Sequence, residues 1–221
     1  MKAALLMTTG FLCMCSGMAC SGHRADPREA RVLLWLDSAP VENPYRDLRF
    51  FGGSPAASWK EWAEHGRKIK GAEEVLIRLC ETDDSPFQRF HILRAMRAIG
   101  SQACVPTLLR VLDEDNATDR GMAACALGQI GSPDAIEPLV DLIGTIRWPR
   151  RDSEERSFIE AHAAVLKANA ISALSRLDRD RARAVIEEEL ATQNPAPIDK
   201  LGLELILKDM ESSPHVEGSG Q

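Results

Sequence analysis

The amino-acid sequence predicts an all-α protein, a short solenoid of stacked helical hairpins with an irregular N-terminal cap. Two segments of the chain repeat each other at a fixed offset, and within each copy apolar residues recur every three or four positions, as on one face of a helix. Alanine and leucine are plentiful, whereas aromatic residues make up only 5% of the chain. This composition favours helices packed closely through small side chains over a β-sandwich.

The repeat is clearest between residues 84–101 and 115–132, which align at an offset of 31. A period of this length is typical of helical solenoids. The aligned positions are Asp84 with Asp115, Arg89 with Arg120, Ala95 with Ala126, and Ile99-Gly100-Ser101 with Ile130-Gly131-Ser132. A third copy aligns at an offset of 47, with Lys167 in the place of Arg120, and it implies an insertion of 16 residues at about 145–160.

Each copy predicts two helices joined by a tight turn. The first helices are expected at about 86–99 and 117–130. Gly100 and Gly131 are expected to end them in the left-handed conformation, which glycine adopts without penalty. The apolar positions of the second helices, which are expected to face the core, are Val105, Leu108, Leu109 and Leu112 in one unit and Ile136, Leu139, Val140 and Ile143 in the next.

Residues 123–131, Ala-Ala-Cys-Ala-Leu-Gly-Gln-Ile-Gly, followed by Asp134-Ala135-Ile136 and Pro138-Leu139, resemble the phycobilisome-lyase branch of HEAT-like repeats. The acidic turn Asp113-Glu114-Asp115 together with Arg120 also fits that family. The resemblance is strong over about 84–144 and fainter on either side. It implies a right-handed α-α superhelix, a short HEAT-like solenoid, and, commonly, a role in binding other proteins.

The chain divides into four expected parts. These are a signal peptide at 1–20, an N-terminal helix and irregular wrap at 21–54, a repeat domain at 55–211 and a disordered tail at 212–221. Trp59 and Trp62 are expected to seal the N-terminal end of the repeat domain, because a terminal unit otherwise exposes a core face. A last helix, from Ile198 to Met210, is expected to cap the other end.

Residues 1–20 have the pattern of a secretory signal. Lys2 supplies a positive start, Ala3 to Met14 form an uncharged apolar run too short to span a bilayer, and small residues precede Cys20. Gly17-Met18-Ala19-Cys20 also resembles the box of bacterial lipoproteins, in which the cysteine receives lipid. Lipidation at Cys20 and simple cleavage both stay open. Both alternatives predict export to the periplasm or cell envelope. A lipid at Cys20 is the expected attachment to a membrane.

Charge and motif content argue against several function classes. The net charge is −6 and residues 71–144 hold six basic and twelve acidic side chains, so nucleic acid is not expected as a partner. The sequence has no GxSxG, P-loop or HExxH motif and no Cys/His cluster, so neither a metal nor a cofactor is expected. Beyond the signal, Cys80, Cys104 and Cys125 lie in apolar helical stretches typical of core cysteines, and one disulfide among them stays open.

The predicted function is a non-enzymatic scaffold for protein–protein interaction, exported or membrane-tethered, with a protein partner of unknown identity. The partner-binding positions, on the concave side of the second helices and at its rim, are expected to be Thr107, Arg110, Glu137, Asp141, Arg147 and Trp148. Trp148 beside arginines has the composition of a binding hot spot, although it could equally fold back on neighbouring helices. Two alternatives stay open: a lyase-like or modifying protein acting on a chromophore or tethered substrate, and a structural role through self-association.

Overall fold

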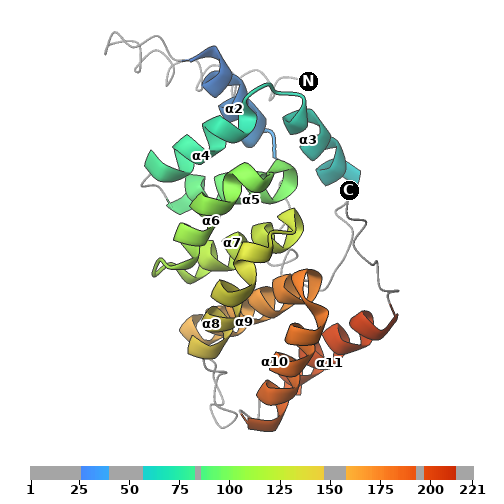
Figure 1. Ribbon diagram of the computed structural model, residues 1–221. Helices are drawn as coiled ribbons and strands as arrows, with labels where there is room; N and C mark the ends of the chain where they lie inside the picture. The colour runs from blue at the N-terminus through green and yellow to red at the C-terminus, as the bar shows by residue number, and fades with distance from the viewer. Residues whose placement is uncertain (1–25, 40–56, 83–85, 147–157, 193–196, 213–221) are drawn as a thin grey trace, which may run out of the picture.

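The computed structural model describes residues 26–39, 57–82, 86–146, 158–192 and 197–212. Within these residues every regular element is a helix and no strand occurs, so the prediction of an all-α solenoid is confirmed. Figure 1 shows the helices stacked from α2 at one end to α10 and α11 at the other. Among the described helices, none has both the length and the apolar composition needed to cross a bilayer.

The stack consists of a layer of first helices and a layer of second helices, with one helix closing each end. The first helices are α3 (Ala57–Arg67), α5 (Pro86–Ile99), α7 (Ala117–Ile130) and α9 (Phe158–Leu177). The second helices are α4 (Ala72–Thr82), α6 (Val105–Leu112), α8 (Ile136–Thr145) and α10 (Arg179–Thr192). The closing helices are α2 (Pro27–Asp37) and α11 (Pro197–Ser212), and short 3₁₀ turns, η2 (Gln102–Cys104) and η3 (Pro133–Ala135), lead into α6 and α8.

Both ends of α7 follow from its sequence. The side chain of Asn116 accepts hydrogen bonds from the backbone N–H groups of Thr118 (3.0 Å) and Asp119 (3.3 Å), which satisfies two donors of the first turn. At the other end Gly131 has φ 77°, and its N–H donates to the Leu127 carbonyl at 3.1 Å. The predicted left-handed cap at Gly131 is therefore confirmed.

The corresponding prediction for Gly100 is wrong. Among the described residues, positive φ angles occur only at Gly71 and Gly131. The N–H of Gly100 instead donates to the Met96 carbonyl at 2.7 Å, and a Cβ on Gly100 would lie 2.4 Å from that oxygen. Glycine is needed here because the backbone approaches itself closely, and not because the chain turns left-handed.

Five of the eight predicted core positions of the second helices are buried: Val105, Leu108, Leu112, Leu139 and Ile143. The other three differ from the prediction. Val111 is fully buried and Leu142 is 4% exposed, whereas Leu109, Ile136 and Val140 are half-buried on the outer side. Leu109 lies about 100° around the helix from Leu108, and the core covers it only in part. The core uses the face of Leu108 and Val111, and it leaves Leu109 partly exposed.

Three tryptophans close the N-terminal end, as predicted for Trp59 and Trp62. Trp35 of α2 joins them: its Nε1–H donates to the Trp62 carbonyl (2.8 Å), and the Nε1–H of Trp62 donates to the Trp35 carbonyl (2.9 Å). The two rings stack with centroids 4.3 Å apart, and Trp59 meets Trp62 edge-on. The N-terminal helix predicted within 21–54 is thus present as α2. Its buried residues are Val32, Trp35 and Leu36, while Leu33 and Leu34 are 37% and 58% exposed.

Replacing Gly66 with alanine should detach α2 from the stack. A Cβ on Gly66 would lie 2.1 Å from the Trp35 ring, so the ring must leave its place against Trp62. Overpacking of this kind costs about 1–3 kcal/mol, more than alanine gains as a better helix former. Limited proteolysis should cut the variant near α2 while the repeats stay intact. Unchanged proteolysis and unchanged tryptophan fluorescence would show that the ring packing is not needed.

Between α8 and α9 the structure has a shorter segment than the insertion predicted there. Helix α8 continues to Thr145 and α9 starts at Phe158, so the segment between them is shorter than the predicted 145–160. Helix α11 spans Pro197–Ser212, and it packs against α9 and α10 as the predicted cap. Of the tail predicted at 212–221, Ser212 is the last residue of α11, and residues 213–221 lie outside the described residues.

Candidate protein-binding face

The outward sides of α4, α6, α8 and α10 form one continuous surface, here called the second-helix face. Arg110 of α6, Glu137 and Asp141 of α8 are exposed on it, as the sequence predicts. Arg110 and Asp141 are one repeat of 31 residues apart, so they occupy the same position on adjacent second helices. These three predicted positions therefore lie on one surface.

Thr107 does not belong to this surface, and its prediction as a binding residue is wrong. Its side chain is buried, with 5% of the residue exposed, and its hydroxyl donates to Oε1 of Glu81 at 3.3 Å. Thr107 lies on the side of α6 that turns toward α4, one turn before the buried Val111. It joins the two helices and is not available to a partner.

Three further predicted positions fall outside the described residues. Arg147 and Trp148 directly follow the last described residue of the second unit, and Cys20 precedes α2. Their roles in partner binding and lipidation stay predictions.

Arginine–glutamate pairs link neighbouring helices along the face, at positions that differ from one junction to the next. Arg78 of α4 pairs with Glu29 of α2 at 2.8 Å, Arg110 of α6 with Glu81 of α4 at 3.3 Å, and Arg181 of α10 with Glu137 of α8 at 3.1 Å. Their side chains are about one third to two thirds exposed, so each pair stabilises the fold by at most about 1 kcal/mol. The main effect of these pairs is to fix long side chains in place along the face.

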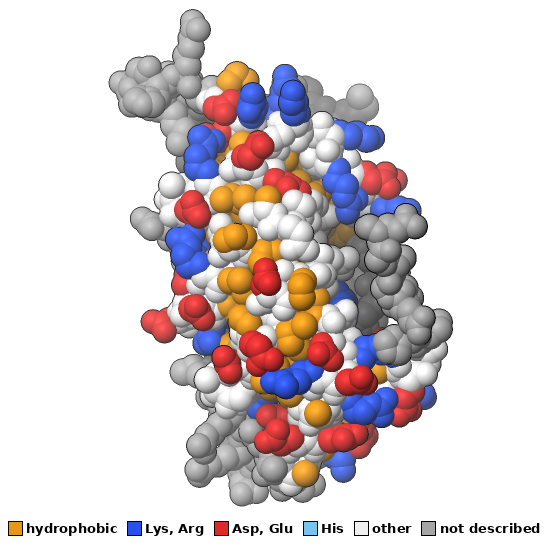
Figure 2. All heavy atoms as spheres, in the orientation of Figure 1, with side chains coloured by type: hydrophobic (Ala, Val, Ile, Leu, Met, Phe, Trp, Pro, Cys, Tyr) orange, Lys and Arg blue, Asp and Glu red, His pale blue; other side chains and the backbone are white. Residues whose placement is uncertain are grey.

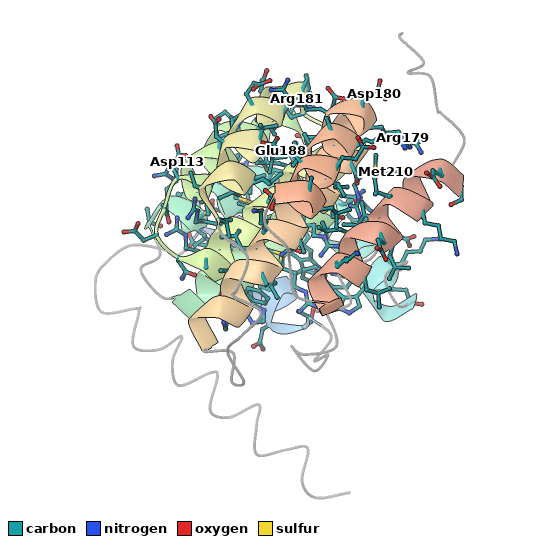
Figure 3. The ribbon with its side chains drawn as sticks, turned by 90° about the horizontal axis from the view of Figure 1, so that it is seen from below. Asp113, Arg179, Asp180, Arg181, Glu188 and Met210 are labelled. Carbon is teal, nitrogen blue, oxygen red and sulfur yellow. The ribbon has the colours of Figure 1, made fainter. Side chains whose placement is uncertain are left out.

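The junction between α6 and α8 differs from the one between α4 and α6, because an aspartate stands on α8 where α6 has Arg110. Asp141 occupies the position of Arg110, and Asp113, at the C-terminal end of α6, corresponds to Glu81 at the end of α4. Both aspartates are exposed, and among the described residues neither has a basic partner within ion-pair distance. Figure 3 shows Asp113 at the edge of the array, well apart from Arg179 and Arg181 of α10.

Half-buried apolar side chains run beside these charges. Ile77 of α4, Leu109 of α6 and Val140 of α8 each precede the charged position of their helix by one residue, and Ile136 lies one turn before Val140. Figure 2 shows apolar atoms gathered along the middle of the face that carries α4, α6 and α8, with acidic and basic groups on both sides. We call these four residues the apolar stripe. The offset of 31 that aligns Leu109 with Val140 was the sequence signal for it.

Polar contacts behind the face hold the units in register. Arg120 and Lys167, which the sequence aligns, make equivalent contacts: Nε of Arg120 donates to the Leu112 carbonyl at 2.8 Å, and Nζ of Lys167 donates to the Ile146 carbonyl at 2.6 Å. Each thus ties a first helix to the end of the preceding second helix. Lys167 is completely buried and also pairs with Glu189 of α10 at 2.5 Å. Burial lowers the pKa of Lys167, and Glu189 opposes that shift.

The three cysteines in the described part of the chain are free thiols within the helical stack. Cys80 and Cys104 are buried and Cys125 is half-buried. Burial raises the pKa of Cys104 to about 11, so its thiol stays protonated and unreactive at neutral pH. Burial likewise raises the pKa of Cys80, although the Arg89 guanidinium opposes it. Within the part of the chain that the structure describes, no group of three or more His, Cys, Asp or Glu side chains is placed to hold a metal ion.

Comparison with known proteins agrees with this architecture. Residues 72–158 match the family model for HEAT repeats. The match starts at the first residue of α4 and ends at the first residue of α9, so it covers the units that carry the apolar stripe. No curated protein matches the chain. Residues 72–158 are therefore similar to HEAT repeats, and they lie within an all-α solenoid.

Proposed function

We propose that this protein is a non-enzymatic scaffold that binds a partner protein through the second-helix face. The observation that supports this proposal is that the same pattern of side chains recurs on each second helix of that face. The same positions on successive helices present an apolar residue followed by a charged one, at Ile77 and Arg78, Leu109 and Arg110, and Val140 and Asp141. A regular pattern on a rigid surface offers a partner many contacts at little cost in conformational entropy.

The interior supports the same proposal. The units are fixed to each other by closely packed helices and by the contacts of Arg120 and Lys167, so the face is preorganised before binding. The buried cysteines have pKa values raised by burial, which does not suit a nucleophile. Such an interior serves to hold the surface in place.

Two finer expectations belong to the proposal. The signal-like residues 1–20 support export, with either cleavage or lipid at Cys20, so the scaffold would act in the periplasm or cell envelope. The resemblance of residues 123–131 to phycobilisome-lyase repeats supports the alternative of a lyase-like protein that acts on a chromophore or tethered substrate. A pigment that absorbs in the purified protein would favour that alternative.

The test is affinity capture of the full-length protein from its native cells, with intact-mass analysis of the mature form. Changing Arg110, Asp141 and Trp148 together to alanine should release the captured partner while helicity and melting stay unchanged. A matched control changes Lys208 and Asp209 of α11, which are exposed and equally balanced in charge, and it should leave capture intact. A partner that stays bound to the triple variant would contradict binding through this face, and the mass decides between lipid and cleavage at Cys20.

A further inference from the structure

The junction between α6 and α8 lacks the basic group that the neighbouring junctions contain. Arg78, Arg110 and Arg181 each pair with a glutamate on the preceding second helix or on α2. At α6 and α8 the positions that correspond to Glu81 and Arg110 hold Asp113 and Asp141, so adjacent helices present two acidic side chains without a described cation. An arginine or lysine from another molecule would supply at this step the cation that Arg110 supplies between α4 and α6.

The surroundings of this junction point to the same kind of ligand. Residues 105–146 contain seven acidic side chains and only two arginines. Both arginines are engaged, Arg110 with Glu81 and Arg120 with the Leu112 carbonyl. The charge that this region offers a ligand is therefore negative. An anionic membrane surface or a nucleic acid would be repelled, and a basic ligand would be attracted.

The ligand must also cover apolar surface. Leu109, Ile136 and Val140 lie half-buried beside the two aspartates, on the face that Figure 2 shows uncovered along its middle. A purely ionic ligand would leave these side chains in water. A segment with apolar residues on one side and basic residues along its edge would bury them while its cations reach Asp113 and Asp141.

We propose that the α6–α8 step of the second-helix face binds a basic amphipathic segment of a partner protein. The apolar side of that segment packs on Leu109, Ile136 and Val140. An arginine or lysine beside it takes the cation position between Asp113 and Asp141. This inference rests on the proposed scaffold function and names the chemistry of the partner.

The probe is a short fluorescein-labelled peptide of leucine, alanine and lysine, with the leucines on one helical face. Its counterpart has glutamate in place of lysine. Fluorescence anisotropy measures the binding of each to the full-length protein at about 0.1 M ionic strength, where charges about 10 Å apart still interact. The decisive variant is Asp141→Arg, which supplies the missing cation from within the chain. Asp209→Arg on α11 makes the same change of net charge on an exposed position away from the face.

The lysine peptide should bind the wild type and the Asp209→Arg variant with equal affinity. Its affinity for the Asp141→Arg variant should be lower by about tenfold or more. The glutamate peptide should not bind. Equal binding of the lysine peptide to wild type and Asp141→Arg, or no binding to the wild type, would overturn the inference. A native partner that is released by the triple change but stays bound to Asp141→Arg would also overturn it, while leaving the scaffold proposal standing.

Discussion

Replacing Lys167 with methionine should lower the free energy of unfolding by about 3–5 kcal/mol, because it leaves the carboxylate of Glu189 buried without its ammonium. Glu189 is only 7% exposed in its side chain, and Lys167 Nζ lies 2.5 Å from it. The Ile146 carbonyl loses its donor in the same change. Because these contacts join α8, α9 and α10, the last unit should separate from the others before the rest unfolds. Urea unfolding followed by circular dichroism measures both effects.

Two variants make this result specific. Changing Lys167 to methionine and Glu189 to leucine together should recover most of the lost stability, because an apolar pair of similar size needs no counter-charge. About 1 kcal/mol should stay lost through the unpaired Ile146 carbonyl. Lys200→Met removes an exposed lysine whose pair with Glu204 is 3.9 Å long, and it should change stability by less than about 0.5 kcal/mol. A single Lys167→Met variant as stable as Lys200→Met would contradict the buried pair.

Much of the fold could be predicted because the aligned copies of the repeat give the positions of their helices. The offset of 31 residues placed α5 and α7 at their observed bounds, and the offset of 47 aligned Lys167 with Arg120, whose contact it reproduces. Glu189 could not be predicted as the partner of Lys167. It is one of three consecutive glutamates, and only the angle at which α10 crosses α9 decides which of them turns inward.

The errors have a common physical cause. The side chain of Leu109 resembles that of Leu108, and composition alone does not fix which faces the core, because the turn before α6 sets the rotation of the helix. The same rotation buries Thr107 and brings Val111 inward. Gly100 shows a related limit, since a glycine required by close approach and one required by positive φ look identical in a sequence.

This rotation also bears on the candidate site. Val111 and Leu142 are buried in the core, whereas Leu109 and Val140 pack against it only in part and form the apolar stripe next to Arg110 and Asp141. The stripe is thus made of side chains that the core leaves half-buried. Complementary charge would steer a partner to the face and fix its register, and the stripe adds apolar surface for the partner to bury.

That register depends on how closely α7 and α9 approach, and Gly128 sets this distance. A Cβ on Gly128 would lie 2.7 Å from the Cα of Ala173 and 2.8 Å from its Cβ, so backbone and not a flexible side chain would have to move. Gly128→Ala should therefore destabilise the protein by about 1–3 kcal/mol, although alanine is the better helix former by about 1 kcal/mol.

The matched control lies in the neighbouring helix. Gly144 of α8 has nothing within 4 Å of its Cβ position, so Gly144→Ala should stabilise the protein by about 0.5–1 kcal/mol. Urea unfolding measures the change in the free energy of unfolding for each variant. Opposite signs for the two glycine-to-alanine changes would separate the effect of packing from that of helix propensity. If both variants were stabilised, the α7–α9 contact would be looser than described. The face would then be a set of independent units, and a change at Asp141 would no longer act on one fixed site.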